Sequence, residues 1–171
     1  SLSEVKLLDG DENIPVFQPI FAPDGSKLAW LSNTGELDQL KLLQLGSGEV
    51  ETLVQGRVLM PPAWVQGLRA LAWSADSQQI IFLENQLGQT SLHAIALNTR
   101  EITRIDTAPY TLIEQPCVSA KGELALLAQS AAKPARILRA SGGQIEVIAR
   151  SQSDVLPAAF LSQPQALTWQ S

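Results

Sequence analysis

The chain has 171 residues, of which 45% are hydrophobic and 17% charged, and its formal net charge is −5. This length and apolar content are enough for one domain with a buried core. The acidic balance excludes the basic faces that select nucleic acid or anionic membranes, so we expect neither partner. No apolar run approaches the ~20 residues of a membrane-spanning helix.

The first segment, residues 1–13, is polar and acidic. Ser1–Glu4 has neither the basic nor the apolar region of a signal peptide. Asp9, Asp11 and Glu12 are close enough in sequence to suggest a hard cation, but they lack the spacing of a calcium loop. We therefore interpret them as a solvated charge cluster and predict no metal site.

An internal repeat dominates the rest of the chain. The segment APDGSKLAWL at 22–31 recurs 52 positions later as SADSQQIIFL at 74–83. A third copy, shorter by one residue at its turn, occupies 119–127. Repeats of this length, each with the same apolar positions, are typical of repeat architectures.

Each copy carries four short apolar or alternating runs separated by turn residues, which is the pattern of antiparallel strands. In chain order, the predicted strands are 16–21, 28–31, 40–45, 49–54, 71–73, 80–83, 92–97, 102–105, 115–118, 124–127, 135–140 and 145–148. Helical periodicity is absent. The pattern predicts an all-β fold, a partial β-propeller of about three four-stranded antiparallel blades.

The predicted organisation has six parts. They are an N-terminal segment 1–13, blade 1 at 14–56, an inter-blade loop at 57–67, blade 2 at 68–109, blade 3 at 110–151 and a connector at 152–171. Binding and catalytic residues often lie on loops of this kind. The simpler interpretation, in which Trp64 covers a blade edge, is favoured.

Three blades cannot close a ring, because closure takes about 4–8 blades. An open stack leaves apolar blade faces uncovered. Either the chain is part of a longer protein or copies associate through these faces. The end of the sequence at 168–171, within an apparent strand, favours the first interpretation.

The segment at 22–30 resembles the repeat core of WD40-like propellers, which occur in TolB-type proteins and in the N-terminal propellers of prolyl oligopeptidase family serine peptidases. Residues 131–138 and 160–169 are similar to the last blade and the exit connector of the acylaminoacyl peptidase and dipeptidyl aminopeptidase branch. Blades 2 and 3 depart from the full Pro-Asp-Gly turn. The resemblance implies a Ser-Asp-His triad in a downstream α/β-hydrolase domain, with this propeller capping the active site and admitting short peptides.

The residues themselves supply no catalytic, cofactor or metal site. Gly46-Ser47-Gly48 lacks the strand-to-helix context of a nucleophile elbow and is predicted to be a turn. His93 is the sole histidine; it aligns with Lys41 and Arg136, and we interpret it as a packing or surface residue. Cys117 is the sole cysteine, so no internal disulfide is possible, and we expect a small buried side chain and a cytoplasmic location.

Three functions remain open. The first is a non-catalytic propeller that gates a serine peptidase acting on short peptides, with the C-terminal hydrolase domain and those peptides as partners. The second is a TolB-like propeller that binds other proteins through its loops. The third is a structural module that self-associates through its blade edges. We expect no peptidase turnover from the chain itself, although the parent protein would be a hydrolase.

Overall fold

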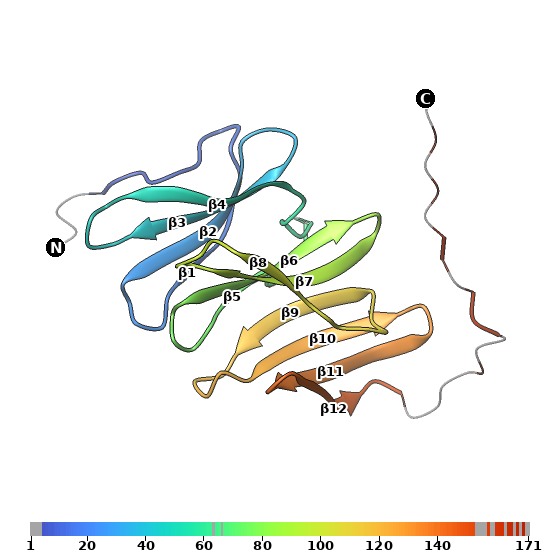
Figure 1. Ribbon diagram of the computed structural model, residues 1–171. Helices are drawn as coiled ribbons and strands as arrows, with labels where there is room; N and C mark the ends of the chain where they lie inside the picture. The colour runs from blue at the N-terminus through green and yellow to red at the C-terminus, as the bar shows by residue number, and fades with distance from the viewer. Residues whose placement is uncertain are drawn as a thin grey trace.

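The computed structural model describes residues 5–62, 64–65, 67–152, 157, 160–162, 164–165, 167 and 169. Twelve strands form three separate four-stranded antiparallel sheets with the orders β1-β2-β3-β4, β5-β6-β7-β8 and β9-β10-β11-β12 (Figure 1). The strands are β1 Val16–Phe21, β2 Lys27–Asn33, β3 Asp38–Gln44, β4 Val50–Arg57, β5 Leu71–Trp73, β6 Gln79–Gln86, β7 Gln89–Ala96, β8 Ile102–Ile105, β9 Leu112–Val118, β10 Leu124–Ser130, β11 Lys133–Ser141 and β12 Gln144–Arg150.

The three sheets are the blades of a partial all-β propeller, so the predicted fold class is confirmed. Every predicted strand overlaps an observed one. Several strands extend beyond their predicted bounds, and β9 begins three residues earlier than predicted, at Leu112. A β-bulge at 115–116 interrupts the alternation there, which hides the start of the strand from a pattern search. No helix among the described residues has the length and apolarity needed to cross a membrane.

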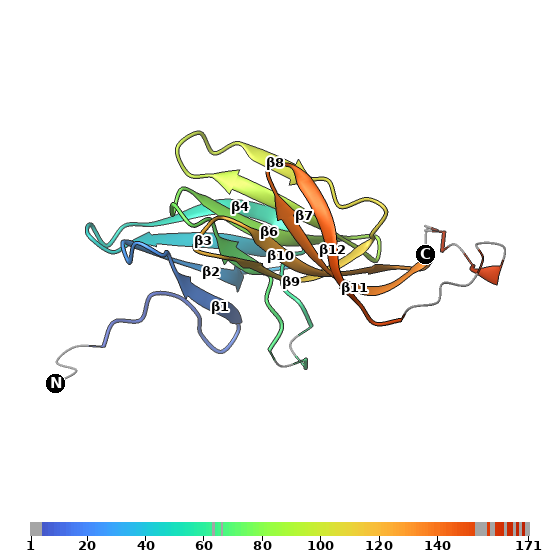
Figure 2. The ribbon, with the colours of Figure 1, turned by 90° about the horizontal axis from the view of Figure 1, so that it is seen from below.

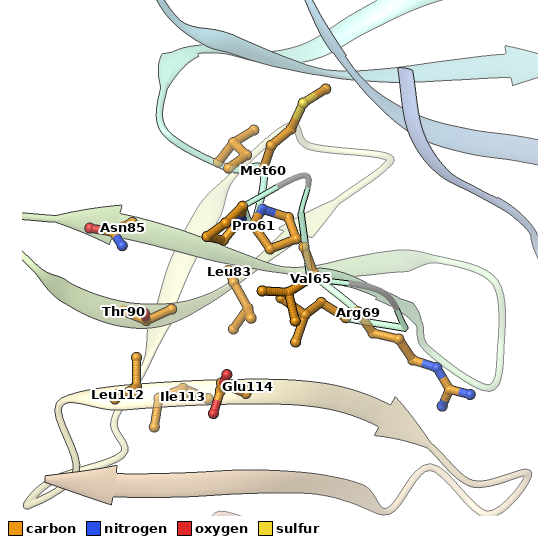
Figure 3. Close-up of a pocket in the computed structure, with 14 residues that line it drawn as sticks. Met60, Pro61, Val65, Arg69, Leu83, Asn85, Thr90, Leu112, Ile113 and Glu114 are labelled. Carbon is orange, nitrogen blue, oxygen red and sulfur yellow. The ribbon is translucent and has the colours of Figure 1, made fainter. Parts of the chain in front are cut away.

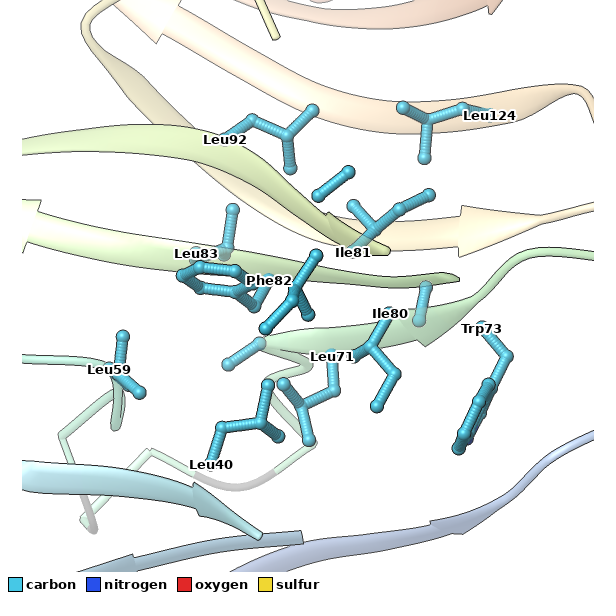
Figure 4. Packing of buried hydrophobic residues seen from close by; sticks show 14 of the residues in the cluster. Leu40, Leu59, Leu71, Trp73, Ile80, Ile81, Phe82, Leu83, Leu92 and Leu124 are labelled. Carbon is cyan, nitrogen blue, oxygen red and sulfur yellow. The ribbon is translucent and has the colours of Figure 1, made fainter. Parts of the chain in front are cut away.

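The hydrophobic core lies between the blades. The central strand β6 has buried side chains on both faces: Phe82 and Ile80 on one, Leu83 and Ile81 on the other. Figure 4 shows Leu40 of blade 1 on one side of blade 2 and Leu124 of blade 3 on the other. A strand buried on both faces reads as a continuous apolar run, which is why this segment lacks alternation.

Two inner strands carry the same local irregularity. β1 and β9 each contain a Gln-Pro bulge, at 18–19 and 115–116, in which the glutamine has a positive φ of 49° or 56°. Gln18 uses its bulged position to reach blade 2. Its Oε1 accepts the N–H groups of Ala70 (2.7 Å) and Leu71 (3.0 Å), and its Nε2 donates to the Leu71 carbonyl (2.8 Å). The bulge therefore links the inner strands of adjacent blades.

The outer face of blade 1 is covered by the N-terminal segment. The Asp9 carboxylate accepts hydrogen bonds from Trp30 Nε1 (2.6 Å) and lies 2.9 Å from Lys41 Nζ, and Trp30 is only 2% exposed. Burial raises the pKa of Asp9, but the bonds from Trp30 and Lys41 outweigh it and hold this pKa at about 2. The expectation of a solvated acidic cluster is therefore wrong for Asp9; Asp11 and Glu12 are exposed as expected.

The opposite end of the stack, the free face of blade 3, mixes apolar and charged groups. Ile137 lies on this face, opposite Leu127 of β10, and is half exposed. Arg139 shares the face and pairs with Glu146 (2.6 Å) and Glu123 (3.6 Å). Charged side chains on a free sheet face discourage indiscriminate pairing.

Candidate functional site

The segment that follows β4 forms the roof of a pocket. It projects from one side of the stacked blades (Figure 2). The buried side chain of Asp38 fixes its first residues, because Asp38 Oδ2 accepts the N–H groups of Leu59 (2.7 Å) and Met60 (2.8 Å). The other carboxylate oxygen accepts Asn33 Nδ2 (2.8 Å). The buried carboxylate is thus fully engaged as a loop anchor.

Two further contacts fix the same segment to blades 2 and 3. The backbone N–H of Asn85 donates to the Val58 carbonyl (2.9 Å), and Gln115 Nε2 donates to the Gly67 carbonyl (3.2 Å). Trp64, between these anchors, is 84% exposed. The favoured interpretation that Trp64 covers a blade edge is therefore wrong, because the anchored segment turns its indole towards solvent.

Under this roof, a pocket of about 300 Å³ opens between blades 2 and 3 (Figure 3). Its lining is mostly apolar and includes Leu83 on blade 2 and Ile113 on blade 3. The polar lining groups are Asn85, Thr90, Glu114 and Arg69; Figure 3 shows the Arg69 guanidinium extending away from the cavity. This combination, an apolar cavity with a few polar groups, is the usual composition of a small-ligand site.

The repeat explains why the pocket opens here. Asn85 and Thr90 form a cross-strand pair in blade 2, as Asn33 and Asp38 do in blade 1. In blade 1 the aspartate seals the junction by holding the chain that follows the outer strand. The threonine at the same place in blade 2 lacks a carboxylate, and it lines the open pocket instead.

A second polar cluster is buried between blades 1 and 2. His93 stacks on Phe82, with ring centroids 5.4 Å apart, and its Nε2 lies 2.9 Å from Ser91 Oγ and 3.2 Å from Glu84 Oε2. Glu84 also accepts a hydrogen bond from Arg57 of blade 1. His93 is a packing residue, as predicted. Its structural equivalents are Lys41 and Leu138, so the alignment with Arg136 is wrong.

Serine, histidine and glutamate meet in this cluster, but not as a catalytic triad. A triad places the serine and the acid on opposite ring nitrogens, so that the imidazole can transfer a proton. Here Ser91 and Glu84 both face Nε2. The Ser91 hydroxyl donates instead to the Glu84 carbonyl (3.4 Å), which leaves His93 Nε2–H to donate to the side chains of both residues. The cluster therefore fixes the junction between blades 1 and 2.

Burial lowers the pKa of His93, and although the Glu84 carboxylate opposes this effect, the net direction is downward. The unfolded chain, with a histidine pKa near 6.5, then binds the proton more readily than the folded chain. The stability that neutral His93 contributes is present above pH 6.5 and is lost as the pH falls through the lower folded-state pKa. We expect urea midpoints to decline between pH 7.5 and 5 in the wild type.

In His93→Gln, which keeps a side-chain N–H donor but has no titrating group, this decline is expected to be smaller over the same interval. Urea denaturation at half-unit pH steps would measure both proteins. Equal pH slopes for the two proteins would contradict the role assigned to His93.

The remaining residues singled out in the sequence lie apart from both clusters. Gly46-Ser47-Gly48 is a turn between β3 and β4, as predicted. Cys117 is exposed, so the prediction of a buried thiol is wrong. The bulge in β9 buries Pro116 and turns the next side chain outwards. Within the described ranges, no group of three or more histidine, cysteine or acidic side chains is arranged to hold a metal ion.

The arrangement of stacked four-stranded blades defines a partial β-propeller, and solved structures with similar blades are known. The neighbours are TolB and the propeller domains of prolyl oligopeptidase family peptidases. The alignment with a TolB protein from Agrobacterium tumefaciens covers 80% of this chain and 50% of that protein, at 17% identity and a TM-score of 0.63. The alignment with a Mycobacterium tuberculosis puromycin-hydrolyzing peptidase covers 94% of this chain and 33% of that protein, at 15% identity and a TM-score of 0.59.

The alignment with the β-propeller domain of the Trilobed protease from Pyrococcus furiosus covers 81% of this chain and 44% of that domain, at 13% identity and a TM-score of 0.52. The chain therefore spans at most half the length of these structures. Identities this low establish the fold alone. No family model matches the sequence, and no curated protein sequence does.

Proposed function

We propose that this chain is a non-catalytic propeller segment that caps and gates the active site of a serine peptidase acting on short peptides. The observation that supports it is the likeness of its three blades to the propellers of such peptidases. In this proposal the partners are a C-terminal α/β-hydrolase domain of the same parent chain and its peptide substrates. Gating follows from size selection, since a propeller over an active site admits only what can pass it.

The position of the pocket fits this role. In antiparallel blades of the same strand order, the outer strands β4, β8 and β12 run in the same direction relative to their blades. The roof of the pocket follows β4, and the chain leaves blade 3 after β12 (Figure 1). A domain that follows blade 3 would start at the end of the propeller that carries the pocket.

A TolB-like binding module is the second candidate, favoured by the match to the Agrobacterium protein. In that case the exposed loop around Trp64 would contact a protein partner. A self-associating module is the third, favoured by the half-exposed Ile137 and Ile148 on blade 3. Light scattering over a range of concentrations separates the third from the others, because a monomer at all concentrations removes it.

The coding sequence that follows Ser171 distinguishes the first two candidates. We expect a Gly-x-Ser-x-Gly motif followed by an aspartate and a histidine, and further blades without a hydrolase segment would favour the TolB-like module. In the full gene product, deleting the three blades is expected to raise the hydrolysis of long peptides relative to that of dipeptide substrates. An unchanged ratio would contradict gating, and turnover by the purified chain alone would contradict its non-catalytic role.

A further inference from the structure

The pocket between blades 2 and 3 keeps its shape through contacts within the chain. Asp38, Asn85 and Gln115 hold its roof from three sides. Its volume of about 300 Å³ lies at the lower end of the range for small-ligand sites, about 300–1,000 Å³. An occupant therefore has the size of one large apolar side chain with a small polar head.

The interior of the pocket is apolar. Leu83 lines it from blade 2 and Ile113 from blade 3, and both are buried. The two charged lining residues direct their charges elsewhere. The guanidinium of Arg69 extends away from the cavity (Figure 3). Glu114 lies directly opposite Leu127 of β10 and shares its face, which is the free face of blade 3. Because burying a charge without a partner is costly, the pocket favours an uncharged occupant.

Asn85 and Thr90 supply the polar groups of the pocket. They pair across the strands of blade 2, on the same face as Leu83, and both are accessible to a ligand. Their equivalents in blade 1 are Asn33 and Asp38, where Asn33 Nδ2 donates to the Asp38 carboxylate (2.8 Å). Threonine in place of this aspartate removes the acceptor, and no other side chain in the described ranges accepts from the Asn85 amide. An oxygen atom of a ligand would replace the missing acceptor.

We propose that this pocket binds a small uncharged carbonyl compound with an apolar body, such as an aryl or alkyl amide. The apolar body lies between Leu83 and Ile113. The carbonyl oxygen accepts hydrogen bonds from Asn85 Nδ2 and from the Thr90 hydroxyl, and so takes the role that the Asp38 carboxylate has in blade 1. This inference is independent of the gating proposal, because it concerns the chain alone.

Titration of the ¹⁵N-labelled chain with 3-phenylpropionamide, followed by amide chemical shifts, tests the site. We expect saturable shifts centred on Thr90 and Ile113. Three related compounds separate the parts of the recognition. Propionamide lacks the apolar body and is expected to bind at least about tenfold more weakly. The cation 2-phenylethylamine and the anion 3-phenylpropionate are each expected to bind at least about fivefold more weakly, because the pocket offers a charge no partner.

Thr90→Val removes the hydroxyl at nearly constant volume, and Asn85→Leu removes the side-chain amide. Each is expected to weaken 3-phenylpropionamide binding by about two- to tenfold, the contribution of one hydrogen bond. Thr103→Val, at an exposed position of β8 outside the pocket, is the matched control and should bind like the wild type. The proposal is overturned by an absence of saturable shifts, by shifts that map elsewhere, or by equal affinity for the amide and either charged compound. Because the compound series uses the wild type, the test stands even where a variant fails to fold.

Discussion

Replacing Phe82 with alanine is expected to lower the free energy of unfolding by about 3–5 kcal/mol. Phe82 is 0% exposed, lies on the central strand of the middle blade and stacks on His93. Its removal leaves a cavity at the junction of blades 1 and 2, where the sheets on both sides limit collapse. The loss would be a large fraction of the 5–15 kcal/mol that is typical for a domain.

Urea denaturation followed by tryptophan fluorescence would measure this loss, with Phe82→Leu as the matched control. Leucine keeps most of the apolar volume, so its cost is expected to be clearly smaller. Val58→Ala, at a position 44% exposed, should change the midpoint little. A Phe82→Ala protein as stable as the leucine variant would show that the blades do not pack as described.

Replacing Asp38 with alanine is expected to cost about 2–4 kcal/mol, since three buried or half-buried donors lose their acceptor and each such loss costs about 1–3 kcal/mol. The donors are the N–H groups of Leu59 and Met60 and the amide of Asn33. Partial access of water to the freed loop keeps the total below the sum. The roof of the pocket should loosen at the same time.

The loosening has its own measurement. Amide hydrogen exchange at Leu59 and Met60 is expected to accelerate in Asp38→Ala more than exchange in β6 does. Asp106→Ala is the control, because Asp106 is exposed and accepts only the local N–H of Ala108. Unchanged exchange at the two amides would contradict the anchoring role of Asp38.

Much of the fold could be predicted from the sequence, because the repeat places the same apolar positions in every blade. The match of 22–31 to 74–83 aligns Trp30 with Phe82, and the structure has both at the same place in their blades. Two of the errors arose where a bulge changes the local geometry. The Gln-Pro bulge in β9 reverses the alternation, which exposes Cys117 and moves the start of the strand.

The candidate site was harder to predict, since its contacts join residues far apart in the sequence. Nothing near Asp9 indicates that it reaches Trp30 and Lys41, and the approach of Arg57 to Glu84 has no local signature. One signal was present in the repeat: the 52-residue offset pairs Asp38 with Thr90. An acid in one copy and a hydroxyl in the next marks the junction where the pocket opens.

The charged pair on the outer face of blade 1 and the charged pair between blades 1 and 2 have opposite arrangements of acid and base, and this has a consequence for assembly. At the outer face of blade 1 an acid, Asp9, meets the base Lys41, whereas at the next junction the base Arg57 meets the acid Glu84. If blade 1 stacked on another blade 1, Arg57 would approach Lys41, and like charges would repel. This charge pattern disfavours the stacking of one blade 1 on another, and it therefore limits wrong pairing between blades while the chain folds.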